Sequence, residues 1–232
     1  LILLGGNSLD QISVKPNFSA VQKYQGWVKQ VEAIYSPTQV GAVMRRAFNA
    51  LKNGPPGPVV VEMTTDVCQQ NVPEEYQNYK SPSYSLQVPN TNEIAKAIEL
   101  WQKARKPVIW AGGGVLASSG SIPLKELAEL TATPVFCTMP GKSSFDERHP
   151  LALGAGCGTT TEMAHKWLTE SDLIIALGTS LTRSPYGQKI LPNKLIIHNT
   201  IDPSDINKDE TAELGLIAVS YTHLRAHETC TN

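Results

Sequence analysis

Three short, uninterrupted apolar runs are the feature that most constrains how this chain can fold. They occupy residues 107–111, 172–177 and 194–198, and each stops in small or polar residues. Continuous apolar runs, unlike alternating ones, are typical of strands that helices cover on both faces. Helical periodicity lies between the first two runs. The sequence therefore predicts an α/β fold, with a Rossmann-like parallel sheet and helices on both of its faces.

The residues that follow these runs stand where such sheets bind ligands. Ligands of parallel α/β sheets lie beyond the carboxyl ends of the strands, and glycine there lets the backbone approach a phosphate or ribose closely. With a further predicted strand at 134–138, the candidate cofactor-binding residues are Gly112, Gly113, Gly114, Thr138, Met139, Gly178, Thr179, Ser180 and Asp202. Two plainer interpretations stay open: the glycines can form tight turns, and Asp202 can cap the turn at 204–206.

The composition excludes several classes of function. The 232 residues allow one large or two smaller domains, and a net charge of −1 argues against nucleic acid or a membrane surface as partner. No apolar run approaches the roughly 18 residues that span a bilayer, and the chain opens at Leu1 without Met or a charged leader, so no secretory signal is expected. No CxxC spacing links the four cysteines, which favours a reducing, cytoplasmic setting; they are Cys68, Cys137, Cys157 and Cys230.

Residues 1–66 are expected to be the C-terminal part of another α/β domain. The pattern predicts a strand at 1–4, an irregular stretch, a helix from Ser36 to Gly54 and a buried strand at 57–63. These elements are too few for a stable domain, so we expect them to belong to a larger one. Residues 67–90, rich in Gln, Asn, Pro, Ser and Tyr without periodicity, are expected to link the two domains.

Residues 91–219 are expected to form the sheet domain. The predicted elements are helices starting at Thr91 and Ser121 and over 162–169, strands at 107–111, 134–138, 172–177, 194–198 and 214–219, and a long loop over 139–158. Within that loop, residues 142–150, which include His149, are expected to be solvated. We find no Ser/His/Asp or Cys/His set that would form a nucleophile system, so nothing in this region is expected to perform chemistry unaided.

The last segment, residues 220–232, does not continue the pattern and is expected to be a foreign or disordered tail. It contains His223 and His227, whose spacing would place both on one face of a helix as in zinc sites, with Glu228 and Cys230 beside them. A chain end without a companion motif is weak support for a metal site. We therefore predict no metal there.

A set of motifs in a fixed order resembles the thiamine diphosphate enzymes of the acetolactate synthase type. The resemblance covers nearly all of residues 1–219 and rests on Gly57-Pro58-Val59-Val60-Val61-Glu62, Asp66-Val67, Ala111-Gly112-Gly113-Gly114-Val115, Pro140-Gly141-Lys142, His149-Pro150-Leu151, Asp172-Leu173-Ile174-Ile175-Ala176-Leu177-Gly178, Ile201-Asp202-Pro203 and Ile206-Asn207-Lys208. Such enzymes have a pyrimidine-binding, a central and a pyrophosphate-binding domain. The resemblance implies that this chain holds the end of the first domain and nearly all of the second.

The resemblance also implies a reaction and where its parts lie. The family uses thiamine diphosphate and Mg²⁺ to decarboxylate or ligate 2-oxo acids, in homodimers or homotetramers, with the cofactor acting as an electron sink. Its catalytic glutamate would precede Leu1, and its metal-binding Gly-Asp-Gly motif does not occur in this sequence. The chain alone is therefore expected to be inactive. Only Lys29 matches a family residue near the active centre, and an exposed lysine is an equally good interpretation.

In the family, the central domain binds FAD in some members and ADP in others, and is empty in many. The flavin-binding pattern expects an arginine where this chain has Ser180, and an acidic residue where it has Thr200. These departures argue against FAD. Two other functions remain as alternatives: a structural or nucleotide-binding module without a catalytic role, and an NAD-dependent enzyme of the sirtuin type. Against the sirtuin alternative, the sequence lacks the paired CxxC zinc ligands and the catalytic histidine motif that are usual in sirtuins.

Overall fold

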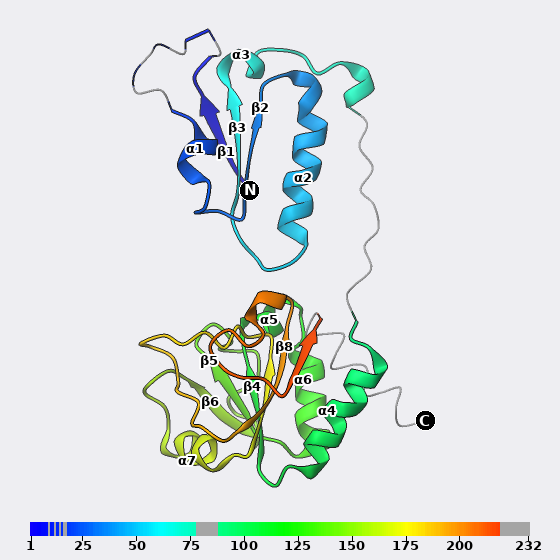
Figure 1. Ribbon diagram of the computed structural model, residues 1–232, viewed down its shortest axis with the longest axis vertical. Helices are drawn as coiled ribbons and strands as arrows, with labels where there is room; N and C mark the ends of the chain where they lie inside the picture. The colour runs from blue at the N-terminus through cyan, green and yellow to red at the C-terminus, as the bar shows by residue number, and fades with distance from the viewer. Residues whose placement is uncertain (9, 12, 14, 16–17, 78–87, 219–232) are drawn as a thin grey trace. The chain divides into compact units, whose positions relative to one another are not determined.

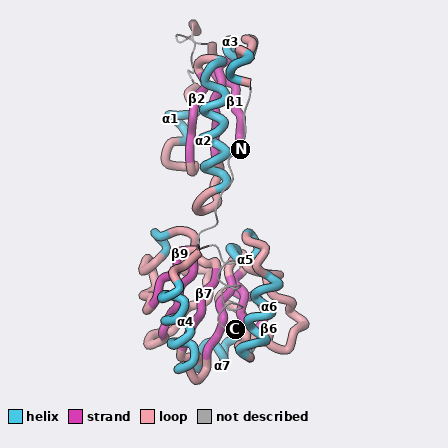
Figure 2. The backbone as a smooth tube through the Cα atoms, turned by 90° about the vertical axis from the view of Figure 1, so that its right-hand side faces the viewer, coloured by secondary structure: helices cyan, strands magenta, loops and turns pink. Residues whose placement is uncertain are grey.

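A computed structural model describes residues 1–8, 10, 11, 13, 15, 18–77 and 88–218. The chain divides into two compact units, Leu1–Tyr84 and Ser85–Asn232, whose elements are labelled in Figure 1. Both units contain helices and strands (Figure 2), which alternate strictly only in the first unit when its 3-10 turns are left aside. None of the helices within the described ranges has the length and apolar character needed to cross a membrane.

The first unit is built on a three-stranded parallel sheet of order β1-β3-β2. Its strands and helices are β1 (Ile2–Gly6), α1 (Ala20–Tyr24), β2 (Gln30–Ile34), α2 (Val40–Lys52), β3 (Val59–Thr64) and α3 (Thr65–Cys68), with short 3-10 turns η1 (Pro37–Gln39) and η2 (Glu74–Tyr76). The predicted helix and closing strand are confirmed as α2 and β3. The stretch predicted to be irregular is not: it contains α1 and β2, which are too short and too polar to show a clear period.

The central strand β3 is covered on both faces because alternate side chains point to opposite sides. Val59 and Val61 pack with Val43 and Ala47 of α2. On the other face, the buried carboxylate of Glu62 accepts a hydrogen bond of 2.8 Å from the backbone N–H of Ala20 in α1. The two helices therefore lie on opposite faces of the sheet.

The second unit contains a six-stranded, all-parallel sheet of order β6-β5-β4-β7-β8-β9. Its strands are β4 (Pro107–Ala111), β5 (Val135–Thr138), β6 (Ala152–Gly156), β7 (Leu173–Leu177), β8 (Leu195–Thr200) and β9 (Leu214–Ile217). The chain builds outward from β4 through β5 to β6, and then returns to the other side of β4 with β7. The strand order thus reverses between β4 and β7, the type of switch point where open α/β sheets bind ligands.

Helices cover both faces of this sheet, as the apolar runs predict. They are α4 (Thr91–Lys103), α5 (Gly113–Ala117), α6 (Ser121–Thr131) and α7 (Glu162–Glu170). Ile109 and Ala111 of β4 share one core with residues of α4, α5 and α6, whereas Val108 and Trp110 share the other with residues of α7. The alternation along this one strand divides the unit into its two cores, which confirms the Rossmann-like α/β fold.

Two expectations for residues 139–158 are wrong. The predicted loop contains strand β6, which the prediction missed because Gly154, Gly156 and two alanines have low strand propensity; the strand forms at the sheet edge through pairing with β5. The segment 142–150 is also not simply solvated, since Ser144 and Phe145 are buried. The side chain of Phe145 joins the core beside α6.

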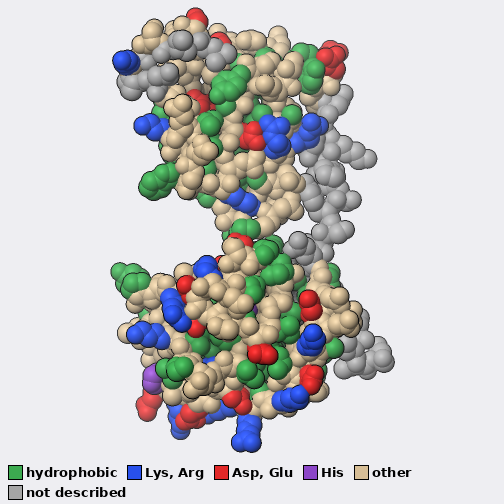
Figure 3. All heavy atoms as spheres, in the orientation of Figure 1, with side chains coloured by type: hydrophobic (Ala, Val, Ile, Leu, Met, Phe, Trp, Pro, Cys, Tyr) green, Lys and Arg blue, Asp and Glu red, His purple; other side chains and the backbone are tan. Residues whose placement is uncertain are grey.

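Charged side chains do not gather by sign on the face of the molecule shown in Figure 3. Basic and acidic groups are interspersed over the described surface of both units. Several ion pairs are local, such as Lys103–Glu99 within α4 and Arg148–Asp146 within one loop. These pairs lie between exposed side chains, so they contribute little to stability because water screens the charges.

Candidate functional site

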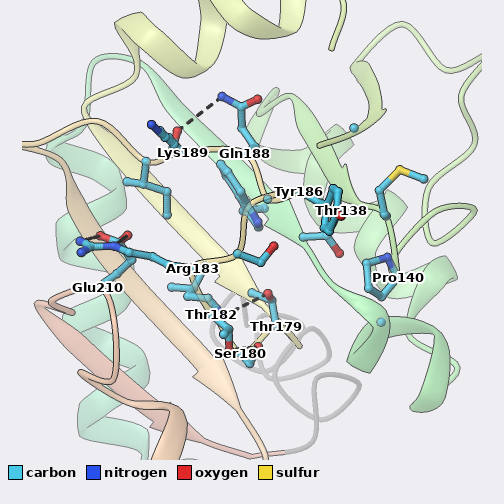
Figure 4. A pocket seen from close by; sticks show the side chains of 18 of the residues that line it. Thr138, Pro140, Thr179, Ser180, Thr182, Arg183, Tyr186, Gln188, Lys189 and Glu210 are labelled. Carbon is cyan, nitrogen blue, oxygen red and sulfur yellow. Dashed lines mark hydrogen bonds and ion pairs between the residues drawn. The ribbon is translucent and has the colours of Figure 1, made fainter. Parts of the chain in front are cut away.

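A cavity of about 780 Å³ opens in the second unit among the segments that follow β4, β5 and β7. Trp110 and Gly113 come from the end of β4 and the start of α5, and residues 138–140 follow β5. Most of the wall comes from residues 178–190 after β7 (Figure 4). The cavity therefore lies at the reversal of strand order, where the fold predicts a ligand.

The sequence-predicted site residues divide into two groups. Those that line the cavity are Gly113, Thr138, Met139, Gly178, Thr179 and Ser180. Gly112, Gly114 and Asp202 belong to the same unit but are not among the lining residues, and Lys29 lies in the first unit. The strand-end argument thus places most of its candidates at one cavity.

Gly112 and Gly114 serve close backbone packing. A Cβ atom added to Gly112 would lie 2.3 Å from the carbonyl oxygen of Gly178, and one added to Gly114 would lie 2.7 Å from the Gly178 Cα atom. The Gly114 N–H donates to the Gly178 carbonyl over 2.8 Å, and Gly178 itself has a φ of 58°. Close packing between the segments that follow β4 and β7 therefore accounts for these two glycines, whereas Gly113 lines the cavity.

Asp202 caps a turn, the other plainer interpretation. It precedes the 3-10 turn η3 (Pro203–Asp205), and its Oδ1 accepts hydrogen bonds from the backbone N–H of Ser204 at 3.0 Å and from the Ser204 hydroxyl at 2.8 Å. These bonds to the charged form lower the pKa of Asp202. Its carboxylate is therefore hydrogen-bonded to the turn that follows β8.

Lys29 is half-buried and bound to protein groups. Its Nζ donates to the backbone carbonyl oxygens of Ala50 and Asn53, at the C-terminal end of α2. A cation there stabilises the negative end of the helix dipole. The lysine is therefore neither freely exposed nor, in this unit, pointed into a cavity, and a catalytic role for it stays a prediction.

The two departures from the flavin-binding pattern have clear positions. Ser180 lines the cavity, and its hydroxyl lies 2.8 Å from that of Thr182. Position 180 therefore supplies a hydroxyl group where the flavin-binding pattern has the positive charge of an arginine. Thr200 is buried and is not a lining residue. Its hydroxyl donates to Asp205 at 3.0 Å and accepts from the Asp202 N–H at 3.1 Å.

A buried histidine contacts a residue of the cavity wall. His198 on β8 is fully buried, and its Nε2 lies 2.7 Å from the carbonyl oxygen of Thr179. Because a carbonyl only accepts, Nε2 carries the proton and donates it. Burial lowers the pKa of His198, and its Nδ1 has no partner within the described part of the chain. The neutral imidazole thereby holds Thr179 in place.

Sequence reasoning missed the charged residues of the cavity. Arg183 and Lys189 line it, together with Glu210 from the segment before β9. The Arg183 guanidinium binds the Glu210 carboxylate through Nε–Oε1 at 2.8 Å and Nη2–Oε2 at 3.3 Å, which raises the pKa of Arg183. Their only sequence signal is a pair of basic residues in the segment after a strand end, and no local pattern links them to Glu210.

The lining residues within the described part of the chain are suited to binding. Hydroxyl groups line it beside two cationic side chains and the rings of Trp110 and Tyr186; the hydroxyl residues are Thr138, Thr179, Ser180, Thr182 and Ser184. No group of three or more His, Cys, Asp or Glu side chains that could hold a metal occurs among the described residues. The histidine pair at 223 and 227 lies outside them.

Comparison with known proteins identifies the family. The model of the family described as "Thiamine pyrophosphate enzyme, central domain" matches residues 94–226. A probable acetolactate synthase large subunit from Methanocaldococcus jannaschii is 32% identical over 96% of this chain and 38% of its own length. An acetolactate synthase from Mycobacterium bovis is 32% identical over 79% of this chain and 30% of its own. An acetolactate synthase large subunit from Corynebacterium glutamicum is 29% identical over 93% of this chain and 34% of its own length.

The chain thus spans only 30% to 38% of the length of these curated relatives. The match to the first of them runs through both compact units, because it covers 96% of the chain. The cavity lies in the second unit, which contains the whole of the family match. The chain belongs to the thiamine pyrophosphate enzyme family, and its residues 94–226 match the central domain of that family.

Proposed function

We propose that the whole protein is a thiamine diphosphate-dependent enzyme of the acetolactate synthase type, which decarboxylates or ligates small 2-oxo acids. The observation that carries this proposal is the match of nearly the entire chain to acetolactate synthase large subunits. The order of motifs through both units supports it as well. A homodimer or homotetramer in the cytoplasm is part of the same proposal.

The proposed organisation assigns residues 1–66 to the end of the pyrimidine-binding domain, 67–90 to a linker and 91–219 to the central domain. The separation of the chain into two compact units supports this division. Residues 220–232 are proposed to be foreign to both domains. They lie outside the described residues.

The described residues do not fit thiamine diphosphate with its magnesium ion. No cluster of potential metal ligands occurs among them, and the sequence contains no Gly-Asp-Gly. We therefore derive no reaction step from this chain, and assign the cofactor's carbanion chemistry to other parts of the whole protein. The catalytic glutamate and the metal site are proposed to lie there.

For the second unit we propose a nucleotide-binding role without catalysis. A cavity with hydroxyls, two aromatic rings and two cations suits a ligand with a ribose, a planar ring and a phosphate. ADP is favoured over FAD because Ser180 and Thr200 replace the polar partners of the flavin pattern, and Thr200 does not reach the cavity lining. A purely structural central domain is the competing function.

Two experiments test these proposals. The whole protein should release CO₂ from pyruvate or another 2-oxo acid, and should lose this activity when thiamine diphosphate is omitted. The 232-residue chain alone should show no turnover. Titration of the chain with ADP, FAD and NAD by calorimetry should show binding of ADP. Tight FAD binding would overturn the choice of ADP, NAD-dependent turnover would favour a sirtuin-type enzyme, and absence of all binding would favour a structural role.

A further inference from the structure

The charged groups of the cavity carry a net positive charge. The charged side chains that line it, within the described residues, are Arg183, Lys189 and Glu210. Lys189 is exposed, so its ammonium group lies in water at the rim. A concave surface with an excess of one charge attracts ligands of the opposite charge, because its low-dielectric walls focus the field. The cavity therefore suits a ligand with an anionic group.

The guanidinium that would take that anion is already engaged. Arg183 is bound at two nitrogens by Glu210, and Figure 4 shows the arginine reaching from its segment to this carboxylate. The Arg183 side chain is 71% exposed, whereas that of Glu210 is 15% exposed. The carboxylate thus lies at the protein surface beneath a largely solvated arginine.

An ion pair of this kind can be exchanged. Water screens this pair from the side of the largely exposed arginine, which limits the free energy that the pair contributes. The arginine side chain is also long enough to turn away. A phosphate offers the same planar guanidinium two acceptor oxygens, with more charge than one carboxylate carries. The backbone N–H of Arg183 is held separately, by the Asp209 carboxylate at 2.8 Å, so the main chain can stay in place while the side chain moves.

We propose that the cavity binds its anionic ligand by exchange, in which a ligand phosphate takes the Arg183 guanidinium from Glu210. Glu210 is then a competitor of the ligand: it holds the arginine in the empty cavity and lowers the affinity for anions. This inference rests on the proposed nucleotide-binding role. It adds which side chain receives the charge and which one opposes it.

Calorimetric titration of the 232-residue chain with ADP, and separately with inorganic pyrophosphate, tests the exchange. Glu210→Gln should raise the affinity for both probes about three- to fivefold, because the competing charge is gone. Arg183→Gln should lower it about tenfold. In the double variant, the effect of Glu210→Gln should disappear, since the two residues act through one interaction. The two probes separate a nucleotide from a simple anion.

The matched control is Asp146→Asn, which breaks the pair of Asp146 with Arg148 outside the cavity lining. It should leave both affinities unchanged, and thermal unfolding should show that every variant is folded. If the wild type binds the probes and Glu210→Gln binds them equally well or more weakly, the exchange is wrong while the nucleotide-binding role stays intact. If neither probe binds wild type or Glu210→Gln at millimolar concentration, the exchange is wrong. Turnover by the whole protein tests the enzymatic proposal independently.

Discussion

Gly112 and Gly178 approach so closely that a Cβ atom on the first would lie 2.3 Å from the carbonyl oxygen of the second. The Gly112 N–H donates to the Leu177 carbonyl over 2.8 Å, and the Gly178 N–H donates to the Asn199 carbonyl over 3.0 Å. This contact joins the ends of β4, β7 and β8 directly beside the cavity. Glycine at these two positions therefore shapes this edge of the cavity, which Gly178 itself lines.

Gly112→Ala should destabilise the second unit by about 3 kcal/mol, because the new methyl group meets backbone that cannot move aside without breaking strand pairing. Urea unfolding followed by tryptophan fluorescence measures this. Gly158→Ala is the control, since a Cβ atom there meets nothing within 4 Å. Equal stability of the two variants would contradict the packing role of Gly112.

His198 should make the stability of the second unit depend on pH. Its pKa is lowered in the folded protein by burial, so the unfolded chain binds a proton first as the pH falls below about 6.5. Stability is then full above that value and falls between it and the lowered folded pKa, by up to about 1.4 kcal/mol per pH unit.

The measurement is the free energy of unfolding at several pH values for wild type and His198→Gln. The variant should lose stability at neutral pH but show a shallower slope below pH 6.5, where the protein otherwise takes up this proton on unfolding. Asp205 and Lys208 also act on His198 electrostatically, and both remain in the variant. An unchanged slope would show that other groups cause the pH dependence.

Asp202→Ala should cost about 1 kcal/mol through loss of the cap on η3. Asp202→Asn keeps an acceptor oxygen and should cost less. Because the pKa of Asp202 is lowered on folding, its contribution is present above the unfolded value near 3.9 and is lost as the pH falls through the folded value. The difference in thermal stability between wild type and Asp202→Ala should therefore be smaller at pH 3 than at pH 7.

Lys29→Met should destabilise the first unit by about 1 kcal/mol, because it leaves the Ala50 and Asn53 carbonyls without their charged donor. Hydrogen exchange should speed up at the C-terminal end of α2 and stay unchanged in the second unit. Lys52→Met, which removes a neighbouring lysine of the same helix, is the comparison. If Lys29→Met alters turnover of the whole protein without altering exchange in α2, a catalytic role is favoured over the structural one.

Elements with a strong local signal were predictable, and those formed by pairing were not. Helix α2 follows a 3-10 turn, η1, that Ser36 caps, and α2 itself has clear apolar periodicity. Strands β4 and β7 are continuous apolar runs, so each of these elements is recognisable from its own residues. Strand β6 contains glycines and alanines, and β2 is half polar. Both are strands because an adjacent strand supplies their hydrogen bonds, which a local pattern does not record.

The sequence by itself determined the class of fold and the sheet edge that carries the cavity, because apolar runs and strand-end residues act locally and their order follows the chain. The family was indicated by a resemblance in the order of its motifs. Only the tertiary structure decided what each candidate does there. In the structure, Gly112 and Gly114 pack against Gly178, and Asp202 caps η3. Arg183 binds Glu210, which lies 27 residues away along the chain. Contacts across such separations depend on how strands pair and segments cross in space, and that information is absent from any single stretch of the chain.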